Sequence, residues 1–157
     1  MKNICRIISV TMIFIGVLSC DREKVYEDFV TIDQQKWNTA APVRLNVNIS
    51  DTANVHNIHL IIRNTAQYQF SNLYLFVTTQ APNGSILEDT TEIILANEHG
   101  KWLGEGAGAA YTLEFPYKEK IKFPLKGIYR FQIEQAMWIP DLMHISHIGL
   151  RVERSEK

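Results

Sequence analysis

Apolar and polar residues alternate along most of the chain that follows Pro42. In residues 43–49 every second residue is apolar and the residues between are polar, which is typical of a strand with one buried face. Similar short stretches predict further strands at residues 58–62, 72–79, 91–95, 111–115, 117–123, 128–136 and 147–153. No segment shows a sustained helical period, so the pattern predicts an all-β protein.

Two of these strands have features that indicate their place in a sheet. Residues 72–79 are apolar on both faces, as expected of a strand central to a sandwich. Residues 117–123 lie between Pro116 and Pro124 and carry lysines, which suits an exposed edge strand. About eight short strands at roughly even spacing predict an antiparallel β-sandwich, and a jelly-roll-like topology is the favoured version.

The first 20 residues follow a different pattern. A basic head precedes an uncharged apolar run at residues 7–18, which would span only about 18 Å as a helix, against about 30 Å for the hydrocarbon core of a bilayer. The run therefore predicts a secretory signal peptide. Residues 17–20 ("VLSC") resemble the lipobox of bacterial lipoproteins, in which the thiol of Cys20 would receive a diacylglycerol. A plain signal peptide with an incidental cysteine is the alternative.

These features divide the chain into three parts. We predict a lipoprotein signal peptide at residues 1–19, a lipidated N-terminus and tether at residues 20–35, and a β-sandwich domain at residues 36–157. Cys5 leaves with the signal, so Cys20 is the only cysteine of the mature chain and no intramolecular disulfide forms. Membrane attachment is expected through the lipid anchor, because no other apolar run approaches the length of a spanning helix.

Charge narrows the classes of partner. The chain has 16 basic and 17 acidic residues, and two basic residues leave with the signal, which leaves 14 against 17 and a net charge of −3. A mildly acidic domain without a basic patch does not neutralise phosphates, so nucleic-acid binding is not expected.

Four histidines occur as two pairs, His56 with His59 and His144 with His147. Residues three apart in a strand point to opposite faces, so neither pair is expected to bind a metal together. The glycine-rich stretch "GEGAGA" at residues 104–109 precedes a strand and not a helix, which argues against a nucleotide-binding loop. No cofactor is therefore expected.

Catalytic patterns are also lacking in the sequence. The chain contains neither G-x-S-x-G nor S-x-x-K, and no two carboxylates stand apart as an acid–base pair. We therefore expect a protein that is not an enzyme and has no small-molecule substrate.

The candidate binding residues are aromatic or apolar. Residues 137–146 include Trp138, Leu142 and Met143 and are more apolar than a solvated loop requires. This loop either folds under to close one end of the sandwich, which we favour slightly, or forms a contact with a protein partner. Trp102, in the glycine-rich segment, is the next candidate. Alternatively, the exposed tryptophans form a platform that binds carbohydrate.

Four stretches carry a resemblance to a known family. "NLYLFVTTQAPNG" at 72–84, "GKWLGEGAG" at 100–108, "RFQIEQAM" at 130–137 and "IGLRVER" at 148–154 closely resemble the gliding-motility lipoproteins of the GldH family. The likeness covers nearly the whole chain, including the lipobox at Cys20 and the "YEDF" that follows.

The resemblance implies an envelope lipoprotein of Bacteroidota-type bacteria that is tied to the gliding machinery and to type IX protein secretion. It implies no enzyme activity and no cofactor. On this basis we expect a scaffold or assembly protein that binds other envelope proteins, anchored in the outer membrane and facing the periplasm. A carbohydrate- or surface-binding module is the alternative.

Overall fold

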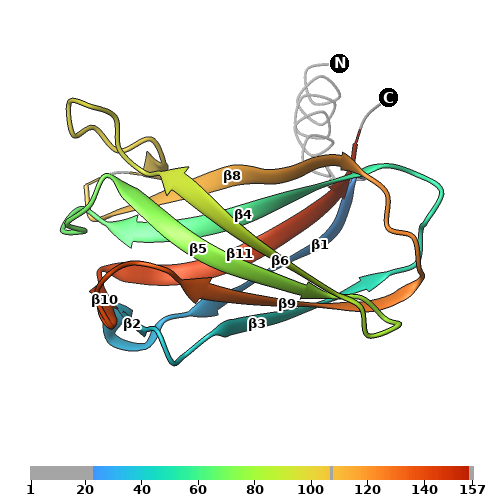
Figure 1. Ribbon diagram of the computed structural model, residues 1–157. Coiled ribbons are helices and arrows are strands. Elements are labelled where there is room, and N and C mark those ends of the chain that lie inside the picture. Colours follow the sequence, from blue (N-terminus) through green and yellow to red (C-terminus); the bar gives the residue numbers. More distant parts are fainter. Residues whose placement is uncertain (1–22, 107, 156–157) are drawn as a thin grey trace, which may run out of the picture.

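Two antiparallel sheets face each other in the computed structural model, which describes residues 23–106 and 108–155 (Figure 1). The predicted signal peptide and Cys20 lie outside these residues. The elements, in chain order, are β1 (Lys24–Thr31), the 3-10 helix η1 (Asp33–Gln35), β2 (Lys36–Asn38), β3 (Val43–Ile49), β4 (His56–Thr65), β5 (Asn72–Gln80), β6 (Ile86–Ile94), β7 (Glu105–Gly106), β8 (Ala110–Ile121), β9 (Gly127–Gln135), β10 (Asp141–Met143) and β11 (Ile145–Arg154).

The order of the strands is that of a jelly roll. One sheet has the order β1-β11-β4-β8-β7 and the other β3-β9-β5-β6, with β10 and β2 as a separate ribbon. Among the eight strands of seven or more residues, numbered along the chain, these orders are 1-8-3-6 and 2-7-4-5. This is the arrangement that closes two Greek keys into a double sheet, so the predicted antiparallel, jelly-roll-like sandwich is confirmed.

The alternating segments place their apolar residues between the two sheets. In β3 the pattern of buried and exposed residues is strictly alternating, with Val43 and Ile49 at its two buried ends. In β9 the buried positions include Phe131 and Ile133, and in β11 they include Leu150. The period of two in the sequence therefore predicted both the strands and the face that each strand buries.

The predicted tether is shorter than expected. The tether predicted at residues 20–35 is in part a strand, because Lys24–Thr31 form β1 and pair with β11 from Lys24↔Glu153 to Thr31↔His147. The strand was missed because it lies at a sheet edge, carries charged side chains and contains a bulge between Lys24 and Tyr26, which together obscure the alternation.

A glycine allows β1 to lie close to its neighbour. A side chain at Gly149, in the middle of β11, would meet the backbone oxygen of Asp28 and the Cβ of Phe29 at 2.8 Å each. The ring of Phe29 packs edge-on against His147, with centroids 5.3 Å apart. The sheet therefore includes β1 as a full member, and the domain begins near Lys24.

Two other strand predictions need correction. Residues 72–79 do form β5 inside a sheet, but only one face is buried, because Tyr74 and Phe76 are 38% and 50% exposed. The predicted strands at 111–115 and 117–123 are one strand, β8, which continues through Pro116. From Leu113 onward β8 pairs only with β4, so its place at an edge agrees with the prediction.

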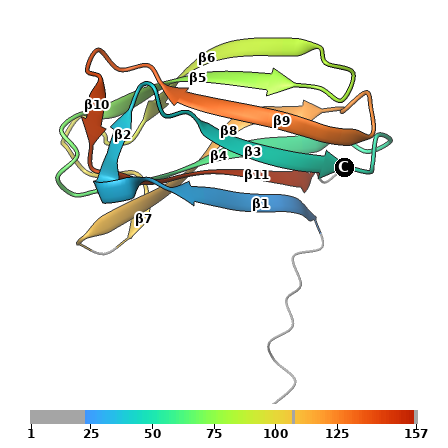
Figure 2. The same cartoon turned by 90° about the horizontal axis from the view of Figure 1, so that it is seen from below.

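The sandwich has two ends, which we call proximal and distal. At the proximal end β1 begins, β11 ends and β4 begins, and at the distal end lie β2 and β10 (Figures 1 and 2). At the proximal end the backbone N–H of Arg154 donates to the carbonyl oxygen of Glu23 (2.8 Å), and that of Ser155 donates to the carbonyl oxygen of Val55 (3.0 Å). A strand of eight residues spans about 26 Å, which sets the approximate separation of the two ends.

Candidate functional site

The distal end is closed by the ribbon of β2 and β10. The strands pair antiparallel, with Trp37 opposite Leu142. Trp37 is 1% and Leu142 0% exposed, and the indole N–H of Trp37 donates a hydrogen bond to the carbonyl oxygen of Ala41 (2.9 Å). Leu142, which the sequence suggested as a residue for partner binding, is therefore a core residue and has no surface to offer a partner.

Polar groups hold the ribbon together at its outer side. One carboxylate oxygen of Asp141 accepts a hydrogen bond from the side-chain amide of Asn38 (2.6 Å), and the other lies 2.9 Å from Nζ of Lys36. Both partners lower the pKa of Asp141, and the hydrogen bond from Asn38 is the larger cause. The ion pair between Lys36 and Asp141 is partly exposed to solvent, so it orients the ribbon more than it stabilises it.

The loop between β9 and β10 is held by one buried amide. Gln135 is 3% exposed, its Nε2 donates to the carbonyl oxygen of Ile139 (2.9 Å), and its Oε1 accepts the backbone N–H of Met137 (2.8 Å). The two hydrogen bonds hold the loop on both sides of Trp138. Trp138 itself is 100% exposed and points away from the domain.

Residues 137–146 divide into a buried part and an exposed part. Leu142 and Ile145 are 0% exposed and close the end of the sandwich. Trp138 and Met143, which is 41% exposed, remain on the surface of the same end. Two of the four candidate binding residues, Trp138 and Met143, are thus exposed at this end.

Trp102 has a different environment. Its ring lies 5.9 Å from that of Tyr111 and 6.3 Å from that of Tyr68, and it is half-buried. Burial raises the pKa of the Tyr68 hydroxyl, which donates to the carbonyl oxygen of Asn72 (3.0 Å). The three tryptophans are therefore separate: Trp37 is in the core, Trp102 is in an aromatic cluster and Trp138 is exposed, with no shared coplanar platform.

An exposed apolar surface that the sequence did not predict lies beside the loop of residues 137–146. Tyr74 and Phe76 lie on the outer face of β5, and the backbone N–H of Tyr74 is 3.4 Å from the sulfur of Met137. The alternation of these aromatic residues with the buried Leu73 and Leu75 was the available signal. The apolar character of both faces predicts burial on both sides. The sequence cannot show that the outer side of β5 is left uncovered.

His56 and His59, on the same strand, lie in different environments. His56 is 0% exposed and packs edge-on against Phe123, with centroids 5.3 Å apart, while His59 lies on the outer face of the sheet between Glu114 (3.4 Å) and Glu153 (3.3 Å). Burial is the main cause that lowers the pKa of His56. The pair therefore points to opposite faces, as the strand geometry predicts.

Two possible kinds of site are not present in the described residues. Within residues 23–106 and 108–155, no group of three or more His, Cys, Asp or Glu side chains is placed to hold a metal ion. In the same part of the chain no helix has the length and apolar character needed to cross a membrane.

The geometry thus defines an all-β sandwich domain that has an exposed aromatic loop at one end. The family model described as GldH lipoprotein matches residues 24–152. The chain therefore belongs to the GldH lipoprotein family.

Individual relatives agree with this assignment. The gliding motility lipoprotein GldH homolog of Christiangramia forsetii is 32% identical over 145 residues, which cover 88% of each chain. The gliding motility lipoprotein GldH of Flavobacterium johnsoniae is 28% identical, and the match covers 89% of this chain and 91% of the relative. Among solved structures, dimeric latent PorU from Porphyromonas gingivalis is 8% identical with a TM-score of 0.30, covering 85% of this chain and 13% of that one, a likeness too weak to carry an argument.

Proposed function

We propose that the protein is a membrane-anchored gliding-motility lipoprotein that acts as a scaffold or assembly factor by binding other envelope proteins. Its family and its named relatives support the motility role and the lipid anchor. The observation that carries the binding role is the fully exposed Trp138 at the distal end. The apolar surface of an exposed tryptophan is removed from water only when a partner covers it. Such residues often dominate the binding energy of an interface.

The position of the anchor supports a protein partner for this tryptophan. Cys20 precedes Lys24 by four residues, which span at most about 14 Å, so a lipid at Cys20 holds the proximal end close to the membrane. The distal end lies about 26 Å further along β1. In that orientation Trp138 and Met143 point away from the lipid, toward the space in which other envelope proteins are found.

Lipidation at Cys20 has a direct test. The Cys20→Ala variant should lose lipid labelling and leave the membrane fraction, since no other cysteine follows it in the chain. Continued labelling of this variant would disprove the anchor. We place the anchor in the outer membrane with the domain in the periplasm, and membrane fractionation together with protease treatment of intact cells tests this location.

The binding role is tested by photocrosslinking in cells. A photoreactive amino acid at position 138 should form a discrete adduct with another envelope protein, while the same probe at Glu98, which is also exposed, should not. Adducts with lipid alone, or equal adducts from both positions, would contradict the proposal. Absence of substrate turnover is part of the same proposal, because the named relatives are motility lipoproteins and not enzymes.

A further inference from the structure

The jelly roll leaves β6 as an open edge of nine residues. It is the last strand of its sheet and pairs only with β5, in an unbroken register from Asn72↔Ile94 to Gln80↔Ile86. β6 crosses the front of the molecule in Figure 1, with no strand on its outer side.

The register shows which backbone groups face the open side. At the two ends of the hairpin, Ala81 donates to Ser85 (2.8 Å) and Leu95 donates to Ser71 (2.7 Å). Hydrogen-bonded pairs recur at every second position of an antiparallel ladder, so the odd-numbered residues of β6 bond to β5. The five even-numbered residues, from Ile86 to Ile94, therefore direct their N–H and C=O groups away from the sheet.

The neighbouring edge of the other sheet is protected against strand pairing by proline, bulges and lysine, which β6 lacks. β8 contains Pro116, two register shifts opposite β4 and the lysines Lys118 and Lys120, and Lys120 has a φ of 52°. Proline, bulges and lysine are the usual means by which sheet edges avoid a further strand. β6 has no proline, no lysine and no register shift.

Several large apolar side chains of β6 are exposed, as they would be if a further strand normally covered them. Ile86, Leu87 and Ile94 are 61%, 58% and 48% exposed, although isoleucine and leucine are usually buried. Leu87 lines an apolar groove of about 240 Å³ between β6 and β8, together with Tyr117 and Ile121. The groove has room for one or two apolar side chains of an added strand.

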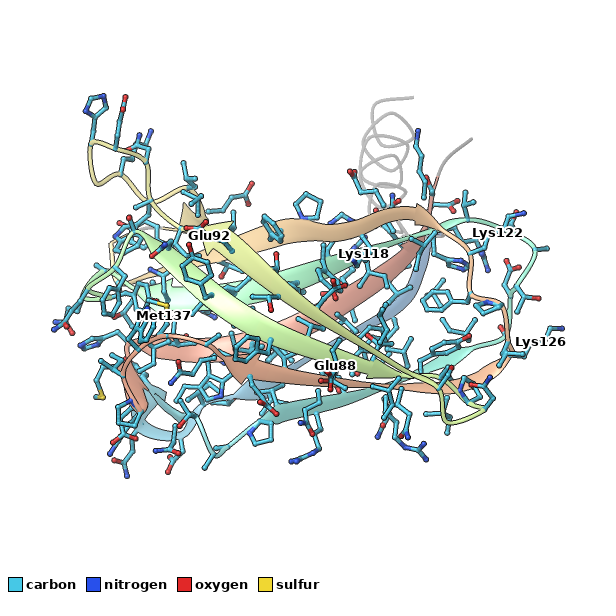
Figure 3. All side chains as sticks on the ribbon, viewed as in Figure 1. Glu88, Glu92, Lys118, Lys122, Lys126 and Met137 are labelled. Carbon is cyan, nitrogen blue, oxygen red and sulfur yellow. The ribbon has the colours of Figure 1, made fainter. Side chains whose placement is uncertain are left out.

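The charge of the strand indicates the chemistry of that neighbour. Glu88 and Glu92 lie on the outer face of β6 and form no ion pair within the described residues, and Glu92 accepts a hydrogen bond from the uncharged side-chain amide of Asn72 (2.6 Å) (Figure 3). Asp89 is already compensated, by Nζ of Lys118 at 2.6 Å and the hydroxyl of Tyr117 at 3.0 Å. A second copy of the chain is a poor neighbour, because antiparallel pairing centred on Thr90 places Glu88 opposite Glu92 of the other copy.

We propose that β6 binds an extended, basic segment of a partner protein, which adds to the four-stranded sheet as a fifth strand. Lysine or arginine at alternate positions of this segment faces Glu88 and Glu92, and the backbone groups of the even-numbered residues supply the ladder. An apolar side chain on the other face of the segment enters the groove beside Leu87. This inference rests on the proposed function, because it names the kind of protein segment that such a lipoprotein binds.

Hydrogen exchange on the full-length lipoprotein in detergent tests the proposal with two synthetic ten-residue peptides. One peptide alternates lysine and valine, and the other alternates glutamate and valine. The lysine peptide should protect the amides of residues 86–94 from exchange and should bind at least tenfold more tightly than the glutamate peptide. Protection at another strand, or equal affinity for the two peptides, would overturn the proposal.

Two variants separate backbone pairing from charge. Thr90→Pro removes an N–H that faces the open side and leaves the ladder to β5 intact, so the affinity for the lysine peptide should fall at least tenfold. The double variant Glu88→Lys and Glu92→Lys keeps the backbone and should weaken binding to the same extent at low salt, whereas Glu98→Lys, off the strand, should change it less than twofold. Undiminished binding by the double variant would refute the charge assignment, even if Thr90→Pro failed to fold.

Further outcomes distinguish a failure of the β6 proposal from a failure of the proposed function. A dimer in sedimentation velocity that Thr90→Pro abolishes would identify a second copy as the occupant of β6 and overturn the partner that we propose. If the lysine peptide leaves β6 unprotected while crosslinks from position 138 persist, the edge proposal fails and the proposed function stands. Pairing at β6 without crosslinks from position 138 would support the edge proposal and contradict the binding role proposed for Trp138.

Discussion

The two ends of the sandwich are closed by different kinds of side chain. At the distal end the ribbon of β2 and β10 covers the core with Trp37 and Leu142, neither of which titrates. At the proximal end the core is covered by His56, whose ring nitrogens have no hydrogen-bond partner among the described residues, against Phe123. At the end that presents Trp138 the core is therefore closed by apolar side chains, with hydrogen bonds from Trp37 and Gln135, whereas the end next to the tether is closed in part by a histidine whose pKa is lowered by burial.

The largest effect is expected when the distal end loses a core side chain. Leu142→Ala should lower the free energy of unfolding by about 2–5 kcal/mol, because the ribbon cannot collapse fully into the space that the side chain leaves. Urea denaturation followed by circular dichroism measures this change. Met143→Ala, at the exposed neighbouring position, is the matched control and should change stability by less than about 0.5 kcal/mol. Equal effects of the two variants would show that the ribbon does not close the core.

A smaller loss is expected in the aromatic cluster at the distal end. Trp102→Ala removes the contacts with Tyr68 and Tyr111 and should cost about 1–3 kcal/mol, less than a fully buried aromatic residue would. Trp102→Phe should recover part of this loss, because a smaller ring still fills the cluster. A Trp102→Ala variant with unchanged unfolding would instead leave Trp102 available as a binding residue.

The sequence predicted the sandwich more fully than the site, for a physical reason. The alternation in β3 and β9 reports directly which face is buried, so these strands could be assigned from local pattern. The fates of Trp138 and Leu142 depend on the pairing of β10 with β2, and the bond between Asn38 and Asp141 joins residues 103 positions apart. Local pattern shows that the loop is apolar, but it does not show which of its side chains turn inward.

The two edge strands make the same point. The edge position of β8 could be predicted because its sequence contains proline and lysines. β1 was not recognised, since its pairing with β11 depends on Gly149, more than one hundred residues away, which admits its backbone and Phe29. The open edge at β6 is visible only when the order of strands in the sheet is known.

The proximal end should be sensitive to acid. Burial lowers the pKa of His56 in the folded state, so below about pH 6.5 the unfolded chain takes up a proton that the folded chain does not. Stability should therefore fall as the pH drops from 7.5 toward 5. His56→Phe, which keeps an aromatic ring against Phe123, should flatten this dependence, whereas His99→Phe at an exposed position should not.

The measurement is the slope of unfolding free energy against pH for each variant, so a change in absolute stability does not affect the comparison. Burial also lowers the pKa of His147, with Arg63 as a second cause, and part of the slope should therefore remain in His56→Phe. A variant whose slope equals that of the wild-type chain would assign the acid sensitivity elsewhere and remove the proposed difference between the two ends.

The smallest effect on stability is expected at the most exposed residue. Trp138→Ala should change the free energy of unfolding by less than about 0.5 kcal/mol, because the side chain is 100% exposed and the loop is held by Gln135 instead. The same variant should lose recovery of the crosslinked envelope partner when the probe is moved to position 143. A clear drop in melting temperature would show that Trp138 packs against the domain in solution, and the exposed distal end would no longer support a binding role. Unchanged stability together with lost recovery would separate the two functions of one loop, since Leu142 holds the fold and Trp138, four residues earlier, contacts the partner.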